Sequence, residues 1–173
     1  RPNIKYTIVS KEESKSKLIK FIEDHHSGDS GIVYCMSRNK VEAIAEWLYE
    51  EGVNALPYHA GMDKNNRAKN QDRFIKEEGI IMVATIAFGM GIDKPDVRFV
   101  AHLDLPKSLE SYYQETGRAG RDGLKSNAWL AYGLEDLSKI IKFIVSSGAS
   151  EDQKRIERQK LDALLGFCES TRC

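Results

Sequence analysis

Two arginines stand beside two glycines in residues 112–123, which read Tyr-Tyr-Gln-Glu-Thr-Gly-Arg-Ala-Gly-Arg-Asp-Gly. A planar guanidinium group can bind two phosphate oxygens at once, and glycines let a ligand or a neighbouring chain approach the backbone closely. Arg118 and Arg121 are therefore candidates for binding phosphate groups in a cleft. The alternative is a surface helix whose arginines face solvent, which is the usual arrangement for an arbitrary pair with this spacing.

Residues 83–95 form a second candidate segment, Val-Ala-Thr-Ile-Ala-Phe-Gly-Met-Gly-Ile-Asp-Lys-Pro, directly after a strongly apolar run. Loops at the carboxyl ends of parallel strands are where such sheets place ligands. Gly89 and Gly91 would let backbone N–H groups approach a phosphate or a ribose, and Thr85 would add a hydroxyl donor. An ordinary strand-to-helix turn is the alternative, and for an isolated Gly-x-Gly it is the more common one.

A third segment, residues 34–40, ends an apolar run and opens a helix at Ser37. Free N–H groups at a helix start, a serine hydroxyl and the adjacent Arg38 would together bind an anion such as a DNA phosphate, although Ser37 could equally only cap the helix. His59 ends a later strand-like run, where a histidine is more often structural than a ligand. Cys35 has no nearby base and is expected to be a small core residue.

Strand-like runs alternate with helix-like periods, the pattern of a parallel sheet with helices on its faces. Two of the runs, residues 31–35 and 80–84, are continuously apolar, as strands buried on both faces should be, and are expected at the sheet centre. The predicted fold class is α/β with three layers. The strands are expected at Ile4–Val9, Gly31–Met36, Ala55–His59, Ile80–Thr85, Val97–Leu103 and Ala128–Tyr132.

Helix signals lie between these runs. Ser10 and Glu13 form an apparent capping box for a first helix, a second helix follows Ser37, and a weaker one covers residues 64–78. The apolar stripe at 137–144 predicts a further helix, and Ser150 with Gln153 predicts a last one whose first half is almost entirely charged. We place a domain boundary at residue 148, which gives a sheet domain at 1–148 and a helical extension at 149–173.

The composition is that of an ordinary globular protein. Lysine plus arginine equals aspartate plus glutamate at 26 each, which argues mildly against a dedicated DNA-binding module but leaves a local basic face open. The apolar runs are too short to span a bilayer, and three cysteines do not make a disulfide framework. We therefore expect a soluble, intracellular protein of the cytoplasm, nucleoid or nucleus, with no membrane partner.

The three candidate segments have the order and spacing of the fourth, fifth and sixth motifs of superfamily-2 helicases, and they resemble those motifs in the form found in RecQ helicases. The strings Ala-Phe-Gly-Met-Gly and Gln-Glu-Thr-Gly-Arg-Ala-Gly-Arg-Asp-Gly carry most of the resemblance, which extends over essentially the whole chain. It implies a RecA-like helicase lobe, the second of the two ATPase lobes of such an enzyme.

The resemblance also implies roles on the nucleotide side. In the family the sixth motif reaches the ATP held by the partner lobe, which assigns Arg121 as the arginine finger and Arg118 as a second phosphate or inter-lobe contact. Such a finger is worth about 10³ to 10⁵ in rate in phosphoryl-transfer enzymes. Gln114 is assigned to holding the motif, and Asp93 to a ribose or inter-lobe contact.

The fifth motif couples the DNA track to the nucleotide site in the family, and its glycines Gly89 and Gly91 are assigned to the nucleotide side by the same resemblance. The remaining candidates are assigned to the DNA backbone. These DNA-phosphate contacts are Ser37, Arg38 and Thr85.

The implied function is an ATP-driven translocase that unwinds duplex DNA with 3′-to-5′ polarity, with single-stranded and duplex DNA and the first RecA-like lobe as partners. Two alternatives remain open. One is the second lobe of another superfamily-2 motor such as an RNA helicase, which shares the Gln-x-x-Gly-Arg-x-x-Arg core. The other is a non-catalytic interaction module, which the presence of both Arg118 and Arg121 disfavours.

The sequence contains no Gly-x-x-x-x-Gly-Lys-Ser/Thr loop and no Asp-Glu-x-His string, the groups that cradle ATP phosphates and hold Mg²⁺. ATP and Mg²⁺ should therefore be bound mainly by the absent first lobe. We expect this chain alone to be inactive as an ATPase.

Residues 167–173, Phe-Cys-Glu-Ser-Thr-Arg-Cys, resemble the entry to the small zinc-binding domain that follows the motor in many RecQ proteins. Cys173 is by that resemblance the candidate first Zn²⁺ ligand of the intact protein. A structural zinc needs about four nitrogen or sulfur ligands. We therefore expect no zinc on this chain by itself.

Overall fold

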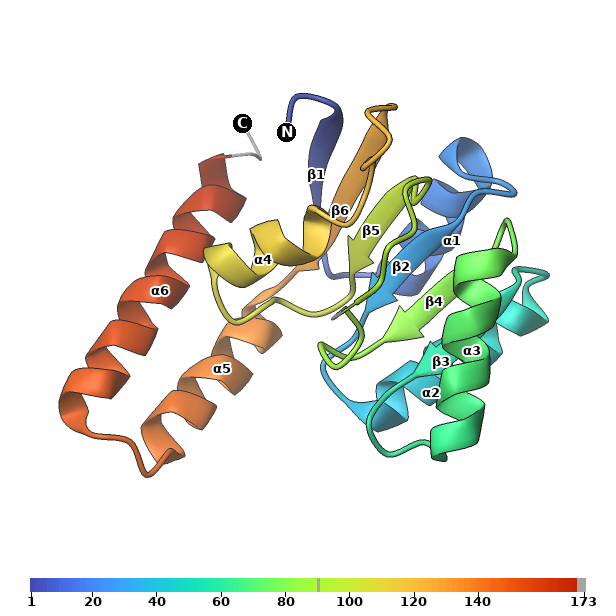
Figure 1. The fold of residues 1–173 in the computed structure, drawn as a ribbon. Helices are drawn as coiled ribbons and strands as arrows, with labels where there is room; N and C mark the ends of the chain where they lie inside the picture. The colour runs from blue at the N-terminus through green and yellow to red at the C-terminus, as the bar shows by residue number, and fades with distance from the viewer. Residues whose placement is uncertain (90, 171–173) are drawn as a thin grey trace.

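Six short apolar segments form a fully parallel β-sheet in the computed structural model, which describes residues 1–89 and 91–170 (Figure 1). The order across the sheet is β1-β6-β5-β2-β4-β3. All six strands lie where the sequence predicted them, with ends that differ by one or two residues. Their bounds are β1 Ile4–Ser10, β2 Gly31–Tyr34, β3 Ala55–Tyr58, β4 Ile81–Ala84, β5 Phe99–His102 and β6 Ser126–Tyr132.

The two continuously apolar runs became interior strands. Every residue of β2 and β4 is buried, because helices cover both faces of the sheet where these strands lie. β2 is central, between β5 and β4, whereas β4 is one position from the edge strand β3. The expectation of a central position therefore holds for β2, and β4 lies next to it.

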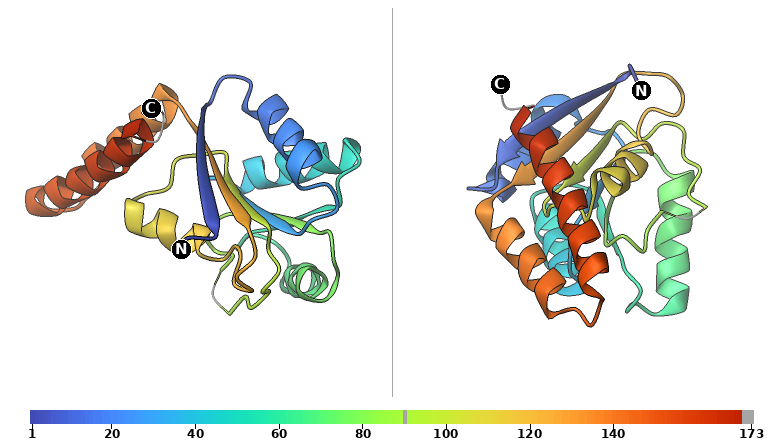
Figure 2. Two further views of the ribbon diagram at one scale, coloured as in Figure 1. Left: turned by 90° about the horizontal axis from the view of Figure 1, so that it is seen from above. Right: turned by 90° about the vertical axis from the view of Figure 1, so that its left-hand side faces the viewer.

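Helices cover the two faces of the sheet and make three layers (Figure 2). Alternate strand residues separate the faces, because Val33 and Ile81 join the core under α1 and α2, whereas Ile32 and Met82 pack with Phe74 of α3. The α/β fold with three layers is therefore confirmed. The helices of these layers are α1 Ser14–His25, α2 Arg38–Glu50, α3 Lys64–Lys76 and α4 Leu109–Thr116.

The start of α2 follows the prediction, and the start of α1 does not. Ser37 is the N-cap of α2, and its Oγ accepts a hydrogen bond from the Lys40 N–H at 3.2 Å. α1 instead begins after Glu13, which has φ 53° and makes no side-chain cap bond. Ser10 ends β1, and its Oγ accepts a bond from Lys17 Nζ at 2.7 Å, so the predicted capping box was wrong.

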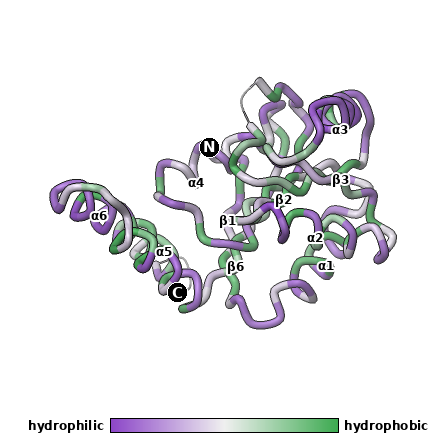
Figure 3. Tube along the Cα trace, turned by 90° about the horizontal axis from the view of Figure 1, so that it is seen from below, coloured by the Kyte–Doolittle hydropathy of each residue, from purple (hydrophilic) through white to green (hydrophobic). Residues whose placement is uncertain are grey.

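Two further helices, α5 (Leu134–Ser146) and α6 (Glu151–Ser170), extend the face that carries α4 (Figure 1). Figure 3 shows the expected contrast between the largely hydrophobic α5 and the hydrophilic start of α6. The second half of α6 buries Leu161 and Leu164 in one cluster with Tyr112 of α4. The division of the chain at residue 148 stays a prediction.

Of the helices in the part of the chain described, none is long and apolar enough to cross a membrane.

The connections between strands determine where ligands can approach. β2 leads into α2 on one face and β5 leads into α4 on the other, so the two chain segments diverge at the carboxyl ends of these neighbouring strands. Open parallel sheets bind ligands at such a switch point. The connection from β4 to β5, residues 85–98, returns across the sheet to the amino ends of the strands, and its described residues contain no helix.

Candidate functional site

The glycine-arginine segment follows α4 and does not lie within it. Ser108 caps the start of α4 by accepting a hydrogen bond from the Ser111 N–H at 3.1 Å, and Gly117 ends the helix. Because α4 begins near the carboxyl end of β5 and precedes the start of β6, its last turn lies toward the amino ends of the strands. Arg118 and Arg121 therefore lie on a turn at the amino edge of the sheet, and not on a solvated helix surface.

Arg118 points inward onto the second candidate segment. Its Nη1 donates a hydrogen bond to the carbonyl oxygen of Gly89, and a Cβ atom at Gly89 would overlap the guanidinium group. The absence of a side chain at Gly89 is thus what allows this contact. The two segments that the sequence singled out separately are brought together here.

Arg121 is held more loosely. Its side chain is 35% exposed, and its Nη1 donates to the carbonyl oxygen of Ile92 at 3.1 Å and contacts Asp93 Oδ1 at 3.3 Å. The Asp93 carboxylate is itself 89% exposed, and an exposed ion pair contributes only about 0–1 kcal/mol. The charge pair with Asp93 therefore contributes little to holding Arg121 in place.

The two carboxylates nearest to Arg121 in the sequence, Asp122 and Glu115, are bonded to other residues. Asp122 pairs with Arg98 at 2.6 Å, and Glu115 accepts a hydrogen bond from His102 Nε2 at 2.7 Å. The observed partner, Asp93, is 28 residues away in the sequence and comes from the segment after β4. The turn directs Arg121 across to this neighbouring segment, so its charged partner does not come from its own part of the sequence.

Gln114 and Arg121 line one open hollow of about 450 Å³ at the amino edge. Gln114 is exposed on the last turn of α4, one residue before the buried Glu115. Gly91 is also exposed, and its φ of 76° is a conformation that favours glycine. The other lining residues of the hollow are Arg1, Ile4, Tyr6, Tyr113 and Gly117.

The candidates for DNA contact lie at the opposite edge of the sheet. Ser37 and Thr85 follow β2 and β4 closely, and Tyr34 and Ala84 are partners in the register of these strands. Ser37 and Arg38 are exposed, and Thr85 is partly exposed. Since parallel strands end at the same edge, Ser37, Arg38 and Thr85 lie at one edge of the sheet.

Arg38 lies against the turn that follows β3. A Cβ atom on Gly61 would lie 3.0 Å from Arg38 Nη1, so this glycine leaves room for the arginine. His59 in the same turn is buried, and its Nε2 donates to Glu42 Oε1 at 2.6 Å while its Nδ1 accepts from the Gly61 N–H at 3.1 Å. Both ring nitrogens of His59 are thus bonded within the fold.

The sequence reasoning missed Asp104, which anchors the loop before Arg38. Its carboxylate accepts hydrogen bonds from the Met36 N–H at 2.7 Å, Lys40 Nζ at 2.8 Å and Lys11 Nζ at 3.0 Å. Burial by itself raises the pKa of Asp104, but the hydrogen bonds from Lys40 and Met36 and the charges of the two lysines outweigh it and lower this pKa. Its position just after β5 could have identified it, since the same strand-end rule identified Thr85 after β4.

Cys35 is a core residue, as predicted. It is buried at the end of β2, and burial, followed by the charge of Asp104, raises the pKa of its thiol to about 12. The described residues contain no group of three histidine, cysteine, aspartate or glutamate side chains that could hold a metal ion. Cys173, the candidate zinc ligand, lies outside the described residues.

Comparison with known proteins identifies the lobe. Residues 13–123 match the helicase conserved C-terminal domain family. The ATP-dependent DNA helicase RecQ of Haemophilus influenzae is 50% identical over 173 residues, which are 100% of this chain and 28% of that protein. The RecQ-like DNA helicase BLM of Xenopus laevis is 42% identical over 98% of this chain and 13% of that protein. This chain therefore spans less than a third of the length of these relatives.

A solved structure shares the fold. The E. coli DEAD-box protein SrmB, bound to regulator of ribonuclease activity A, matches with a TM-score of 0.64 and 28% identity, over 82% of this chain and 84% of that one. The sequence family, the parallel sheet and the order of the three motifs agree with one another. The chain therefore belongs to the helicase conserved C-terminal domain family, in its RecQ form, and is a helicase motor lobe.

Proposed function

We propose that this chain is the second motor lobe of an ATP-dependent DNA helicase that moves 3′ to 5′, and that Arg121 is its arginine finger. The observation that carries this proposal is the state of Arg121. It projects from a fixed turn into the hollow that Gln114 also lines, and its charged partner is an exposed carboxylate. An arginine with a purely structural role would be expected to have stronger and more buried partners.

The chemistry that such an arginine would serve is hydrolysis of the terminal phosphoryl group of ATP. Water attacks the γ-phosphorus, the bond to the bridging oxygen breaks, and ADP and phosphate are released. Negative charge that develops on the phosphoryl oxygens would be stabilised by the planar guanidinium of Arg121. Gln114 would orient the substrate from the same hollow, and ATP and Mg²⁺ would be held mainly by the first lobe, which this chain lacks.

The residues around Arg121 would have other roles. Arg118 would hold the two motif segments together through Gly89 and so act at the junction between the lobes, or on a phosphate when the turn opens. Asp93 would be the partner that releases Arg121 to the nucleotide. At the opposite edge, Ser37, Arg38 and Thr85 would bind the phosphates of single-stranded DNA, which carries little sequence information.

The test is Arg121→Ala and Arg121→Lys in the full-length enzyme. We expect DNA-stimulated ATP turnover to fall by roughly 10² or more in both, with ATP and DNA affinities within a few-fold of wild type. Lysine should not restore turnover, because an ammonium group cannot bridge two phosphate oxygens. The control is Arg73→Ala, which removes an arginine of α3 that pairs with Glu77 and does not line the hollow.

Near-normal turnover in Arg121→Ala with Arg118 intact, or a large drop in melting temperature, would contradict the assignment. The second candidate is another superfamily-2 motor, such as an RNA helicase, which the likeness to SrmB keeps open. Identity of 50% to a RecQ protein against 28% to SrmB favours the DNA helicase. Unwinding of matched DNA and RNA duplexes by the full-length protein distinguishes the two.

A further inference from the structure

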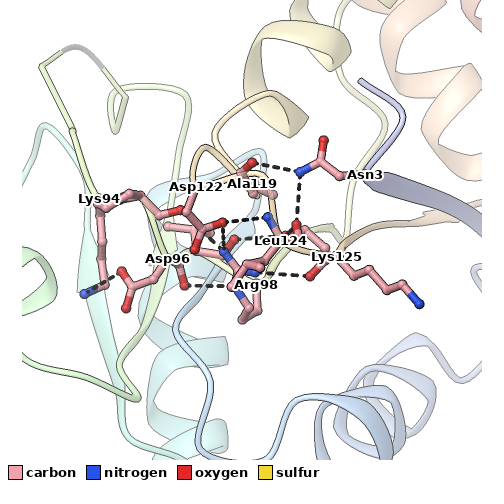
Figure 4. A network of polar contacts seen from close by, with 12 residues as sticks. Asn3, Lys94, Asp96, Arg98, Ala119, Asp122, Leu124 and Lys125 are labelled. Atoms are coloured by element: carbon pink, nitrogen blue, oxygen red, sulfur yellow. Dashed lines mark hydrogen bonds and ion pairs between the residues drawn. The ribbon is translucent and has the colours of Figure 1, made fainter.

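Arg98, which no motif contains, connects two parts of the proposed ATP-facing site (Figure 4). It lies immediately before β5, and its side chain is 15% exposed. On one side its Nε donates to the carbonyl oxygen of Asp96 at 3.2 Å and its Nη2 to that of Pro95 at 3.4 Å. On the other side its Nη2 donates to Asp122 Oδ1 at 2.6 Å and its Nη1 to the carbonyl oxygen of Lys125 at 3.2 Å.

These four acceptors belong to two segments that carry functional candidates. Pro95 and Asp96 end the segment that presents Asp93, and Asp122 directly follows Arg121. Asp122 is fixed further because its backbone N–H donates to the Pro95 carbonyl at 3.2 Å. Arg98 is thus a cross-link between the segment before β5 and the turn that carries Arg121.

The turn is also clamped from the opposite side. Asn3 Nδ2 donates to the carbonyl oxygens of Gly120 at 2.8 Å and Leu124 at 3.0 Å (Figure 4). Gly120 has φ 62°, and a Cβ atom there would lie 2.7 Å from Ser126 Oγ. Because Asn3 and the backbone hydrogen bonds from Gly120 and Asp122 also hold the turn, loss of Arg98 should leave it folded but less firmly fixed against the segment of Asp93.

We propose that Arg98 is a positioning residue for ATP hydrolysis, which sets the place of Arg121 without touching ATP. This inference rests on the proposed role of Arg121. Displacing a catalytic group by about 1 Å can lower the rate about 10²-fold. A cross-link that fixes Asp122, the residue next to Arg121, should therefore have a large effect on turnover. The direction of the Asp122 pKa agrees with a firm contact, because the hydrogen bond from Arg98 lowers it.

The experiment uses the full-length enzyme with Arg98→Met and Asp122→Asn. Each variant is tested for DNA-stimulated kcat and KM for ATP, and for its affinity for ADP alone and for ADP with fluoroaluminate, which mimics the transferred phosphoryl group. We expect Arg98→Met to lower kcat by about 10-fold or more, with KM and the ADP affinity within about 3-fold. The affinity for the fluoroaluminate complex should fall in parallel with kcat.

Asp122→Asn keeps the hydrogen bonds of Arg98 to carbonyl groups and weakens only its bond to the turn. This variant therefore tests the same role if Arg98→Met fails to fold. It should lower kcat several-fold in the same pattern. Arg98→Lys should not restore kcat, because lysine cannot reach acceptors on both sides at once. The control is Arg73→Met, which removes a more exposed guanidinium–carboxylate pair, that of Arg73 in α3 with Glu77 just after it.

A folded Arg98→Met or Asp122→Asn variant with kcat within about 2-fold of wild type would overturn the inference, as would equal losses of affinity for ADP and for its fluoroaluminate complex. Arg121→Ala is measured in parallel. If turnover survives in Arg121→Ala, the proposed function fails. If it is lost there but kept in the Arg98 and Asp122 variants, only the positioning role fails.

Discussion

Asp104, just after β5, contacts three other parts of the fold through one carboxylate. Its carboxylate accepts hydrogen bonds from Lys11 at the end of β1, from Met36 in the loop after β2 and from Lys40 in the first turn of α2. Lys11 Nζ also contacts Asp136, which is buried in the first turn of α5. The loop that presents the proposed DNA contacts is therefore held by a buried charge network.

The pH dependence of this network follows from the lowered pKa of Asp104. Because the pKa is lower in the folded state than the usual unfolded value of about 3.9, Asp104 stabilises the fold fully above that value and progressively less as the pH falls below it. Asp104→Asn should lower the free energy of unfolding by about 1–3 kcal/mol at pH 7, because it leaves the network without its charged acceptor. Urea unfolding at several pH values measures this.

The same measurement gives a second expectation, that the loss of stability below about pH 4 is shallower in Asp104→Asn than in wild type. Asp72→Asn is the matched control, since Asp72 forms an exposed pair with Lys76 on α3. Identical acid slopes for wild type and Asp104→Asn would mean that the carboxylate is not the titrating group.

At the scale of elements, apolar runs were sufficient to predict the strands, because burial of a parallel strand on both faces leaves a continuous apolar sequence. The helix stripe after Ser37 was equally informative, and its residues Val41, Ile44 and Leu48 are all buried. The start of α1 was mispredicted because Ser10 bonds to Lys17, seven residues on, and leaves Glu13 at the cap position. Local capping rules do not include such competing partners.

Contacts between distant segments could not be predicted from the sequence. The pairs Arg121–Asp93 and Arg98–Asp122 join residues 28 and 24 positions apart, and they form only because the segment after β4 returns to the amino edge. The motif strings identified Arg121 by resemblance, but nothing local marked Arg98, an arginine at the start of an apolar strand. Some residues of the candidate site could therefore be predicted from the sequence, but the contacts that support them could not.

The proposed DNA contacts at the carboxyl ends of β2 and β4 lead to a specific prediction about the salt dependence of DNA binding. Each phosphate neutralised by a cation on single-stranded DNA contributes about 0.7 to the slope of log affinity against log salt. Arg38→Ala in the full-length enzyme should reduce that slope by about 0.7, whereas Thr85→Ala should weaken binding without changing the slope, since it removes no charge. Fluorescence anisotropy with a labelled single strand at several salt concentrations measures both.

The control for these variants is Arg155→Ala, which removes an exposed arginine of α6 that pairs with Asp152. Its affinity and slope should match wild type. An unchanged affinity and slope in the double variant Arg38→Ala/Thr85→Ala would remove this face from the DNA track.

At the scale of the whole molecule, the proposed sites occupy opposite ends of the same strands. Strands of four residues are about 13 Å long, and residues 85–98 run from the Thr85 end to the Asp93 end. Lys94 anchors this segment, because its Nζ is buried, donates to the carbonyl oxygen of Glu77 at 3.2 Å and lies near the Phe74 ring of α3. The two proposed sites are thus joined by a segment packed onto the sheet.

The lobe carries only one side of the proposed ATP site, and its behaviour in isolation follows from that. Its sequence offers Arg121 and Gln114 but no phosphate-binding loop, and an arginine finger accelerates a reaction only on a substrate that other groups already hold. The purified chain should therefore show no measurable ATP turnover with saturating single-stranded DNA, while the full-length enzyme turns over. The Arg121→Ala form of the same chain serves as the control. Turnover that persists in that variant comes from a contaminant, and DNA-stimulated turnover that disappears with Arg121 would show that the lobe is catalytic by itself.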